Sequence, residues 1–299
     1  MKLLRTGKVK EVYDAGSKEL RFRFTDNISV FDKVIPTAIP RKGESLARTS
    51  AFWFQKLEAA GICKTHFLGL PSPTEMRVRR VEVIPDHSKL NGDTTNYLIP
   101  LEVICRHYAA GSFNDRIKDG SIKPADVGLA AAPKPGDKLP EPFIEFTTKL
   151  ETVDRNLDER EALEISGLSA DELQQLKETV LKIDALVERH VTVRGLVHVD
   201  GKKEFGYDEE RRLMIVDTFG TADEDRWWEA KALAEGRTID VSKEFVRQYY
   251  RSTGYHEALY AARAAGQPEP PIPALPADVV AATSQLYGGL FERLTGQKF

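Results

Sequence analysis

A charged stretch near residue 200 constrains the fold of this chain more than any other segment. Residues 196–207 set Asp200, Lys202, Lys203 and Glu204 between apolar residues, residues 208–211 have the composition of a turn, and residues 212–217 are mostly apolar up to a final aspartate. Two segments of this kind on either side of a polar turn are typical of two antiparallel strands. The sequence therefore predicts a β-hairpin here.

The register of this hairpin decides which side chains meet. If an even number of loop residues is centred on the turn, Tyr207 pairs with Arg212 and Lys202 lies opposite Asp217. Strand side chains alternate between faces, and residues opposite each other share a face. The residues expected on one face are therefore Asp200, Lys202, Glu204 and Asp217.

Two interpretations of this face are open. Three carboxylates around one lysine repel each other unless a further cation is present, and Mg²⁺ takes protein carboxylates together with phosphate oxygens. The face could thus be a magnesium–nucleotide site whose lysine contacts a phosphate or a substrate carboxylate. It could also be a solvated strand face, and a bulge at Gly201 would break the alternation.

The rest of the chain predicts a mixture of strands and helices. Strands are expected at residues 8–13, 20–24, 76–84 and 97–106. Helices are expected at residues 44–60, after a capping box at 169–172, after Ser242 and at 279–294, with an extended proline-rich linker at 267–276. This order predicts an α+β fold in two lobes with a cleft between them: an N-terminal antiparallel β lobe at 1–100 and a larger α+β lobe at 101–299.

The composition argues against several classes of protein. The net charge of -3 over 299 residues argues against a broad nucleic-acid surface, though not against a local basic pocket. The first residues lack the apolar stretch of a signal peptide, and no apolar run approaches the ~20 residues that cross a bilayer. Cys63 and Cys105 lack metal-ligand spacing and are expected to be reduced core residues. We therefore expect a cytoplasmic protein with no membrane partner.

Two basic segments are candidates for binding phosphate. Lys8 and Lys10 follow a glycine and precede a strand, although the spacing is not that of a Walker A loop. Arg106 stands at a strand end ahead of Gly111 and Ser112, so a guanidinium fork, a backbone N–H and a hydroxyl could hold one phosphate together. Taken singly, each segment is equally compatible with an ordinary surface.

Taken together, these segments resemble the SAICAR synthetase family, whose motifs occur here in the same order and cover nearly the whole chain. The resembling segments are residues 7–13 (G-K-x-K-x-x-Y), 26–32 (D-x-x-S-x-x-D), 102–112 (E-x-x-x-R, then G-S), 148–151 (T-K-x-E), 200–206 (D-x-K-x-E-F-G) and Asp217 followed by Arg226. The match at residues 200–206 is the most specific.

The resemblance implies an ATP-dependent ligase of purine synthesis. Such an enzyme joins L-aspartate to carboxyaminoimidazole ribonucleotide through an acyl phosphate and releases ADP and phosphate, so its partners are three small molecules. It implies an N-terminal lobe that binds the nucleotide in the cleft, and a C-terminal lobe that binds substrate and metal. The residues that it implies for binding ATP are Lys8, Lys10, Lys149, Glu204 and Asp217, of which Glu204 and Asp217 would also hold Mg²⁺. Asp200 and Lys202 would act on the reacting carboxylate or amine. The ribonucleotide would be bound by Arg106, Gly111, Ser112 and Arg226.

The chain departs from the family pattern in places. Thr218 stands where many members have an acid, and residues 220–225 replace a Ser-Pro-Asp run. We therefore carry over no role to residues 152–158 or 218–225, and assign no adenine contact within 85–99.

Two other classes compete with the ligase. A small-molecule or protein kinase also combines a glycine-containing loop, a lysine and metal-binding acids, but the H-R-D and D-F-G signatures are absent. A non-catalytic nucleotide-binding or RNA-binding module would stack bases on aromatics such as Trp53 and Trp227, although their spacing and the acidic balance favour core packing. The sequence pattern does not distinguish a monomer from a homo-oligomer.

Overall fold

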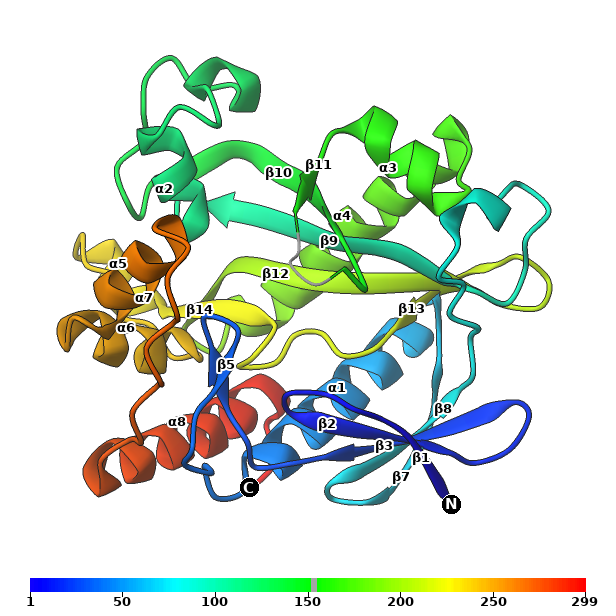
Figure 1. Ribbon diagram of the computed structural model, residues 1–299, viewed down its shortest axis with the longest axis horizontal. Helices are drawn as coiled ribbons and strands as arrows, with labels where there is room; N and C mark the ends of the chain where they lie inside the picture. Colours follow the sequence, from blue (N-terminus) through cyan, green and yellow to red (C-terminus); the bar gives the residue numbers. More distant parts are fainter. Residues whose placement is uncertain (152–154) are drawn as a thin grey trace.

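The computed structural model describes residues 1–151 and 155–299, and two mainly antiparallel sheets organise it (Figure 1). The smaller sheet has the strand order β1-β2-β3-β8-β7. Its strands are β1 (Lys2–Thr6), β2 (Lys10–Asp14), β3 (Glu19–Phe24), β7 (Phe67–Ser72) and β8 (Glu75–Arg79). The strand expected at 76–84 ends at Arg79, because Glu82 forms an isolated bridge with Tyr97 instead of continuing the ladder.

The larger sheet has the order β11-β10-β9-β12-β13-β6, and β14 also pairs with β12. Its strands are β6 (Lys64–Thr65), β9 (Leu98–Tyr108), β10 (Lys138–Thr148), β11 (Asn156–Leu157), β12 (Leu196–Tyr207), β13 (Leu213–Val216) and β14 (Asp225–Glu229). A separate hairpin joins β4 (Ser29–Val30) to β5 (Lys33–Val34). The α+β class with antiparallel sheets, predicted from the sequence, is confirmed.

Helices cover the sheets on several sides. They are α1 (Lys42–Ala59), α2 (Ser112–Lys118), α3 (Glu159–Ser166), α4 (Ala170–Thr192), α5 (Ala230–Ala234), α6 (Glu244–Ser252), α7 (Tyr255–Ala264) and α8 (Ala277–Thr295), with short 3-10 turns η1 (His87–Lys89) and η2 (Pro124–Val127). Helix α4 packs on β9 and β12, while α1 packs on the smaller sheet and on α8 (Figure 1). Ser169 caps α4 in a capping box, as predicted, whereas α6 begins one residue later than a cap at Ser242 would place it.

The hydrophobic core is continuous across the two sheets. One cluster of buried side chains includes Phe22 of β3, Trp53 of α1, Tyr97 beside β9 and Leu176 of α4. The rings of Trp53 and Trp227 are fully buried, which supports core packing over base stacking. The division of the chain into two lobes at residue 100 stays a prediction. Strand β6, which precedes that point, pairs at the edge of the larger sheet.

Candidate active site

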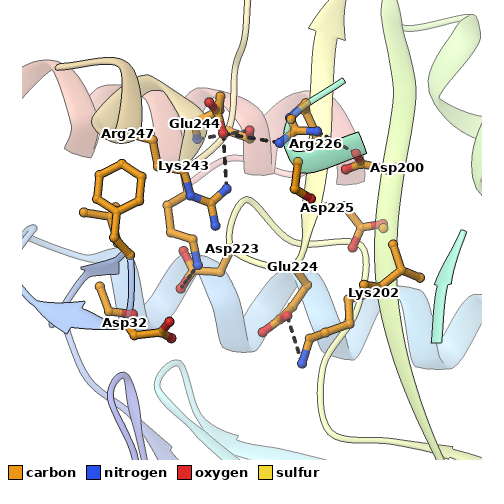
Figure 2. Close-up of a pocket in the computed structure, with 18 of the residues that line it drawn as sticks. Asp32, Asp200, Lys202, Asp223, Glu224, Asp225, Arg226, Lys243, Glu244 and Arg247 are labelled. Carbon is orange, nitrogen blue, oxygen red and sulfur yellow. Dashed lines mark hydrogen bonds and ion pairs between the residues drawn. The ribbon is translucent and has the colours of Figure 1, made fainter. Parts of the chain in front are cut away.

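A cavity of about 910 Å³ opens between the smaller sheet's loops, the larger sheet and the C-terminal helices (Figure 2). Its lining comes from the β4–β5 hairpin, β9, the start of α2, β12, the loop before β14, and α6. Charged side chains of both signs face it, among them Arg106, Asp200, Lys202, Glu224 and Arg226. A cavity of this size and polarity suits charged small molecules.

Strand β12 presents Asp200 and Lys202 to this cavity, and Glu204 lies on the same face of the strand, as the hairpin pattern predicts. The pairing of β12 with β9 is uninterrupted from Asp200 to Glu204, so the side chains of Asp200, Lys202 and Glu204 share a face. The ammonium group of Lys202 donates to Glu204 Oε1 at 2.6 Å and to Glu102 Oε1, from β9, at 2.8 Å. Two neighbouring strands therefore supply one ion-pair network.

Gly201 does not interrupt the alternation of side chains, since it pairs in register with Cys105 of β9. The side chain of Asp225 lies directly against the backbone of Gly201. A Cβ atom at Gly201 would overlap the Asp225 carboxylate, which also pairs with His198 (Nε2 to Oδ2, 2.7 Å). The strand bulge considered at Gly201 is instead a shift of register between His198 and Asp200, where β12 pairs with β14.

The predicted register of the hairpin is wrong by one residue. Tyr207 pairs with Leu213 and Glu204 with Val216, because the loop at 209–211 holds three residues and Arg211 adopts a left-handed backbone (φ 52°). Continuing this ladder would put Asp217 on the face opposite to Glu204.

Asp217 nevertheless reaches the predicted cluster by another route. Strand β13 ends at Val216, and Asp217 itself adopts a left-handed backbone with φ of 61°. This turn breaks the alternation and brings the carboxylate to the ammonium group of Lys10. A conformation that costs free energy in a non-glycine residue is thus found where the candidate site needs a third acid.

These contacts define a lysine–carboxylate cluster, made of Lys10, Lys149, Lys202, Glu102, Glu204 and Asp217. Lys149 Nζ lies 2.7 Å from Glu204 Oε1 and 3.6 Å from Glu102 Oε1. Burial raises the pKa of Asp217, but the nearby lysines lower it by more, so its carboxyl pKa stays well below the usual range. Burial lowers the pKa of Lys149, but the nearby carboxylates, above all Glu204, raise it by more. The pKa of Lys149 is therefore raised. The cluster holds three anions and three cations.

The donor set of this cluster fits a magnesium ion. Glu204 and Asp217 contribute hard carboxylate oxygens of the kind that Mg²⁺ prefers, and Glu102 offers a third carboxylate beside them. The lysines suit phosphate oxygens, since an ammonium group paired with a carboxylate can exchange it for another anion.

A second group, the arginine pair, lies further along the same sheet. Arg226 Nη1 donates to Asp200 Oδ2 at 2.6 Å, and Arg106 Nη1 donates to the same oxygen at 3.2 Å. Arg106 Nη2 also reaches Ser112 Oγ at 3.4 Å. Asp200 therefore lies between two guanidinium groups, and the structure gives it arginine partners where the sequence pattern suggested Lys202.

Gly111 leaves room for the arginine pair. It has a left-handed φ of 57°, and a Cβ atom there would approach Arg226 Nη1 to 2.8 Å. A larger residue would strain the backbone and displace the guanidinium group. The Gly-Ser turn and both arginines thus form one basic pocket.

Lys8 lies apart from the cluster that contains Lys10. Its ammonium group pairs with Asp32 Oδ1 at 2.6 Å, and both side chains are largely exposed at the edge of the cavity. The Lys8–Asp32 ion pair links the loop before β2 to the β4–β5 hairpin.

Sequence reasoning missed several residues that line the cavity. Glu102 stands in the E-x-x-x-R motif but received no role, although four residues on a strand place it on the same face as Arg106. Glu224, Lys243 and Arg247 also line the cavity, and Glu224 falls in the stretch to which no role was carried over. Of the stretch 152–158, residues 152–154 lie outside the described residues.

Comparisons with known proteins agree with this architecture. The family model described as SAICAR synthetase matches residues 3–262. The chain belongs to the SAICAR synthetase family. The prediction made from its motifs is confirmed.

Relatives place the chain within this family along its whole length. It is 56% identical over 299 residues to the phosphoribosylaminoimidazole-succinocarboxamide synthase of Thermoplasma acidophilum, covering 100% of both chains. The SAICAR synthase of Saccharomyces cerevisiae, solved with SAICAR, has 25% identity, a TM-score of 0.75 and coverage of 99% of this chain and 95% of its own. A type-2 SAICAR synthetase solved with ADP has 24% identity, a TM-score of 0.71 and coverage of 99% and 98%.

These relatives confirm the predicted enzyme class, the ATP-dependent ligase of purine biosynthesis that acts on small molecules, and none of the three is a kinase. In the described part of the chain, the helices are too short or too polar to cross a membrane.

Proposed function

We propose that this SAICAR synthetase family member joins L-aspartate to carboxyaminoimidazole ribonucleotide in the cavity described above, using ATP. The observation that carries the proposal is that one face of β9 and β12 bears both groups: Glu102, Lys202 and Glu204 of the lysine–carboxylate cluster, and Arg106 with its partner Asp200. That face can hold a triphosphate and a ribonucleotide phosphate side by side. The relatives solved with ADP and with SAICAR support such an occupancy.

The chemistry needs an activated carboxylate, because a carboxylate is a poor electrophile. Phosphorylation by ATP gives an acyl phosphate, and the aspartate amine displaces phosphate from it. The protein aligns the reactants and neutralises charge, and such alignment contributes on the order of 7–11 kcal/mol to lowering a barrier.

The roles we propose follow the two charged groups. Lys8, Lys10 and Lys149 would bind ATP phosphates, and Glu204 and Asp217 would hold Mg²⁺. When bound, Mg²⁺ supplies neutralisation of phosphate charge. Lys202, in contact with Glu204, would orient the carboxylate that reacts.

At the other end of the cavity, the arginine pair and the Gly111–Ser112 turn would bind the ribonucleotide phosphate. Asp200 would orient both guanidinium groups, and through them the ribonucleotide that carries the reacting carboxylate. A phosphate would compete for these guanidinium groups with Asp200 and Glu244, and two charges on the phosphate favour the exchange. The cytoplasmic location expected from the sequence is part of this proposal.

The proposal is tested by mixing the purified protein with Mg-ATP, carboxyaminoimidazole ribonucleotide and aspartate. We expect ADP and the succinocarboxamide product, and no ADP when any substrate is omitted. ATP consumption that does not depend on aspartate would contradict the ligase and favour a kinase-like phosphotransferase. Salt-sensitive retention of RNA would instead favour the binding-module alternative.

Replacing Arg226 with alanine should weaken ribonucleotide binding more than ATP binding. The guanidinium is mostly buried and takes part in the arginine pair, while Arg106 remains to neutralise Asp200. The loss of one charge-assisted partner should raise the KM for ribonucleotide about 10-fold to 100-fold. Titrations of R226A with each substrate measure this, with Arg160→Ala on the exposed side of α3 as the control. A larger loss of ATP affinity than of ribonucleotide affinity would overturn the assignment.

A further inference from the structure

The loop between β13 and β14 places an acid in the cavity that the family motifs do not include. Glu224 belongs to the stretch 220–225, where the sequence departs from the family pattern. We propose that Glu224 is the base that accepts a proton from the α-ammonium group of aspartate. The inference rests on the proposed function and adds a catalytic residue to it.

The position of Glu224 is fixed by a backbone hydrogen bond to strand β12. Its backbone carbonyl accepts the N–H of Lys202 at 3.2 Å, so the loop is bonded to β12 at that residue. Its Oε2 atom lies 3.4 Å from Lys202 Nζ, and its side chain is 22% exposed. Figure 2 shows the carboxylate of Glu224 in the cavity beside the ammonium group of Lys202. An amine that approaches a carboxylate oriented by Lys202 would therefore pass close to Glu224.

The neighbouring acids of this loop are already engaged. Asp223 accepts from Lys42 at 2.8 Å and from Tyr287 at 2.6 Å, and Asp225 binds His198 and the N–H of Gly220. Their carboxylate oxygens stabilise the fold and are poorly placed to take a proton from substrate.

Three further acids of the cavity wall are also held by strong partners. Asp200 lies between the two arginines, Glu244 accepts from Arg226, Arg247 and Gln248, and Glu102 accepts from Lys202. Glu224, by contrast, has only a long contact to Lys202 for its carboxylate among the described residues. Among the acids around Lys202, Glu224 is thus the one whose carboxylate is held by a single loose partner and is free to accept a proton.

The surroundings of Glu224 also favour a stronger base than an ordinary glutamate. Burial raises the pKa of its carboxyl above the ordinary value, and Lys202 and Lys243 lower it only in part. The negative charges of Asp217 and Glu204 raise its pKa further. General bases are most effective when their pKa lies close to the working pH.

The step balances in protons and electrons. The carboxylate of Glu224 takes one proton from the ammonium group, which leaves a neutral amine. The amine lone pair forms the new C–N bond, and the C–O bond to phosphate breaks with its electron pair on the phosphate. The second proton of nitrogen goes to the departing phosphate, and Glu224 returns its own proton to water.

The test compares aspartate with hydroxylamine, an amine that is already neutral at neutral pH and needs no base. The variant is Glu224→Gln, which keeps the shape but cannot accept a proton. Turnover with aspartate should fall about 100-fold, while hydroxamate formation from Mg-ATP, ribonucleotide and hydroxylamine stays at the wild-type rate. Glu224→Asp should restore part of the aspartate rate, and Glu164→Gln on exposed α3 is the matched control.

A second readout is the pH dependence of kcat/KM for aspartate. The wild-type value should fall as the pH is lowered through the pKa of Glu224, and the acidic limb should be absent in E224Q. An unchanged limb, an unchanged aspartate rate, or equal losses with both amines would overturn the role of Glu224. A wild-type protein that forms ADP with neither amine would overturn the proposed function itself.

Discussion

Lys202→Ala is expected to lower kcat about 100-fold to 1,000-fold while leaving the fold intact. The ammonium group of Lys202 contacts Glu204, Glu102 and Glu224, and is the cation at the centre of the cavity wall. Without it, the cavity loses the positive charge that we propose orients the reacting carboxylate. Glu204 and Glu102 keep Lys149 as a partner, and of the three acids only Glu224 loses its one, longer contact.

Steady-state kinetics and a urea unfolding curve measured on the same preparation test this prediction. Lys18→Ala is the control, because Lys18 forms an exposed ion pair with Glu209 and lies outside the cavity. A K202A protein as active as the wild type would remove Lys202 from the mechanism. A large drop in its unfolding midpoint would show that the side chain acts on stability.

Lys203→Ala, one residue further along β12, is expected to lower the stability of the fold while leaving turnover nearly unchanged. Lys203 points to the other face, where its ammonium group lies 2.5 Å from Asp184 Oδ1 of α4 with both side chains essentially inaccessible to solvent. Removing one partner of a buried ion pair costs about 3–5 kcal/mol of unfolding free energy. The folded fraction of K203A should retain a turnover close to that of the wild type.

The environment of Asp184 explains why this loss should be large. Burial raises the pKa of its carboxyl, but Lys203 and the histidines His107 and His198 lower it by more, so the group stays ionised. Cys105 also lies close enough to His107 and Asp184 for the three to share a metal ion, yet Lys203 already neutralises the carboxylate. Alanine at 203 would leave this buried charge with His107 at 3.0 Å.

Urea unfolding of K203A, D184L and the double variant K203M/D184L tests the pair. The single variants should be much less stable than the wild type, and the double variant should recover part of the loss because it buries no unpaired charge. Unfolding midpoints for K203A and wild type that coincide would contradict the prediction.

The sequence alone was sufficient for features that depend on local periodicity. Alternation in residues 196–207 predicted that Asp200, Lys202 and Glu204 share a face, and the capping box at Ser169 predicted the start of α4. The order of the motifs also predicted the family. Strand alternation and helix capping are determined by residues a few positions apart, so they can be read without knowing how distant segments meet.

The tertiary structure alone decided which charges are partners. Asp217 reaches Lys10 through a left-handed backbone that replaces the expected strand register. Asp200 pairs with Arg106 and Arg226, which come from β9 and β14 on either side of β12. These contacts depend on loop length and on the order of strands in the sheet, which side-chain periodicity does not encode. The same reason explains why Glu224, placed by a bond between its own carbonyl and Lys202, could not be found from its sequence context.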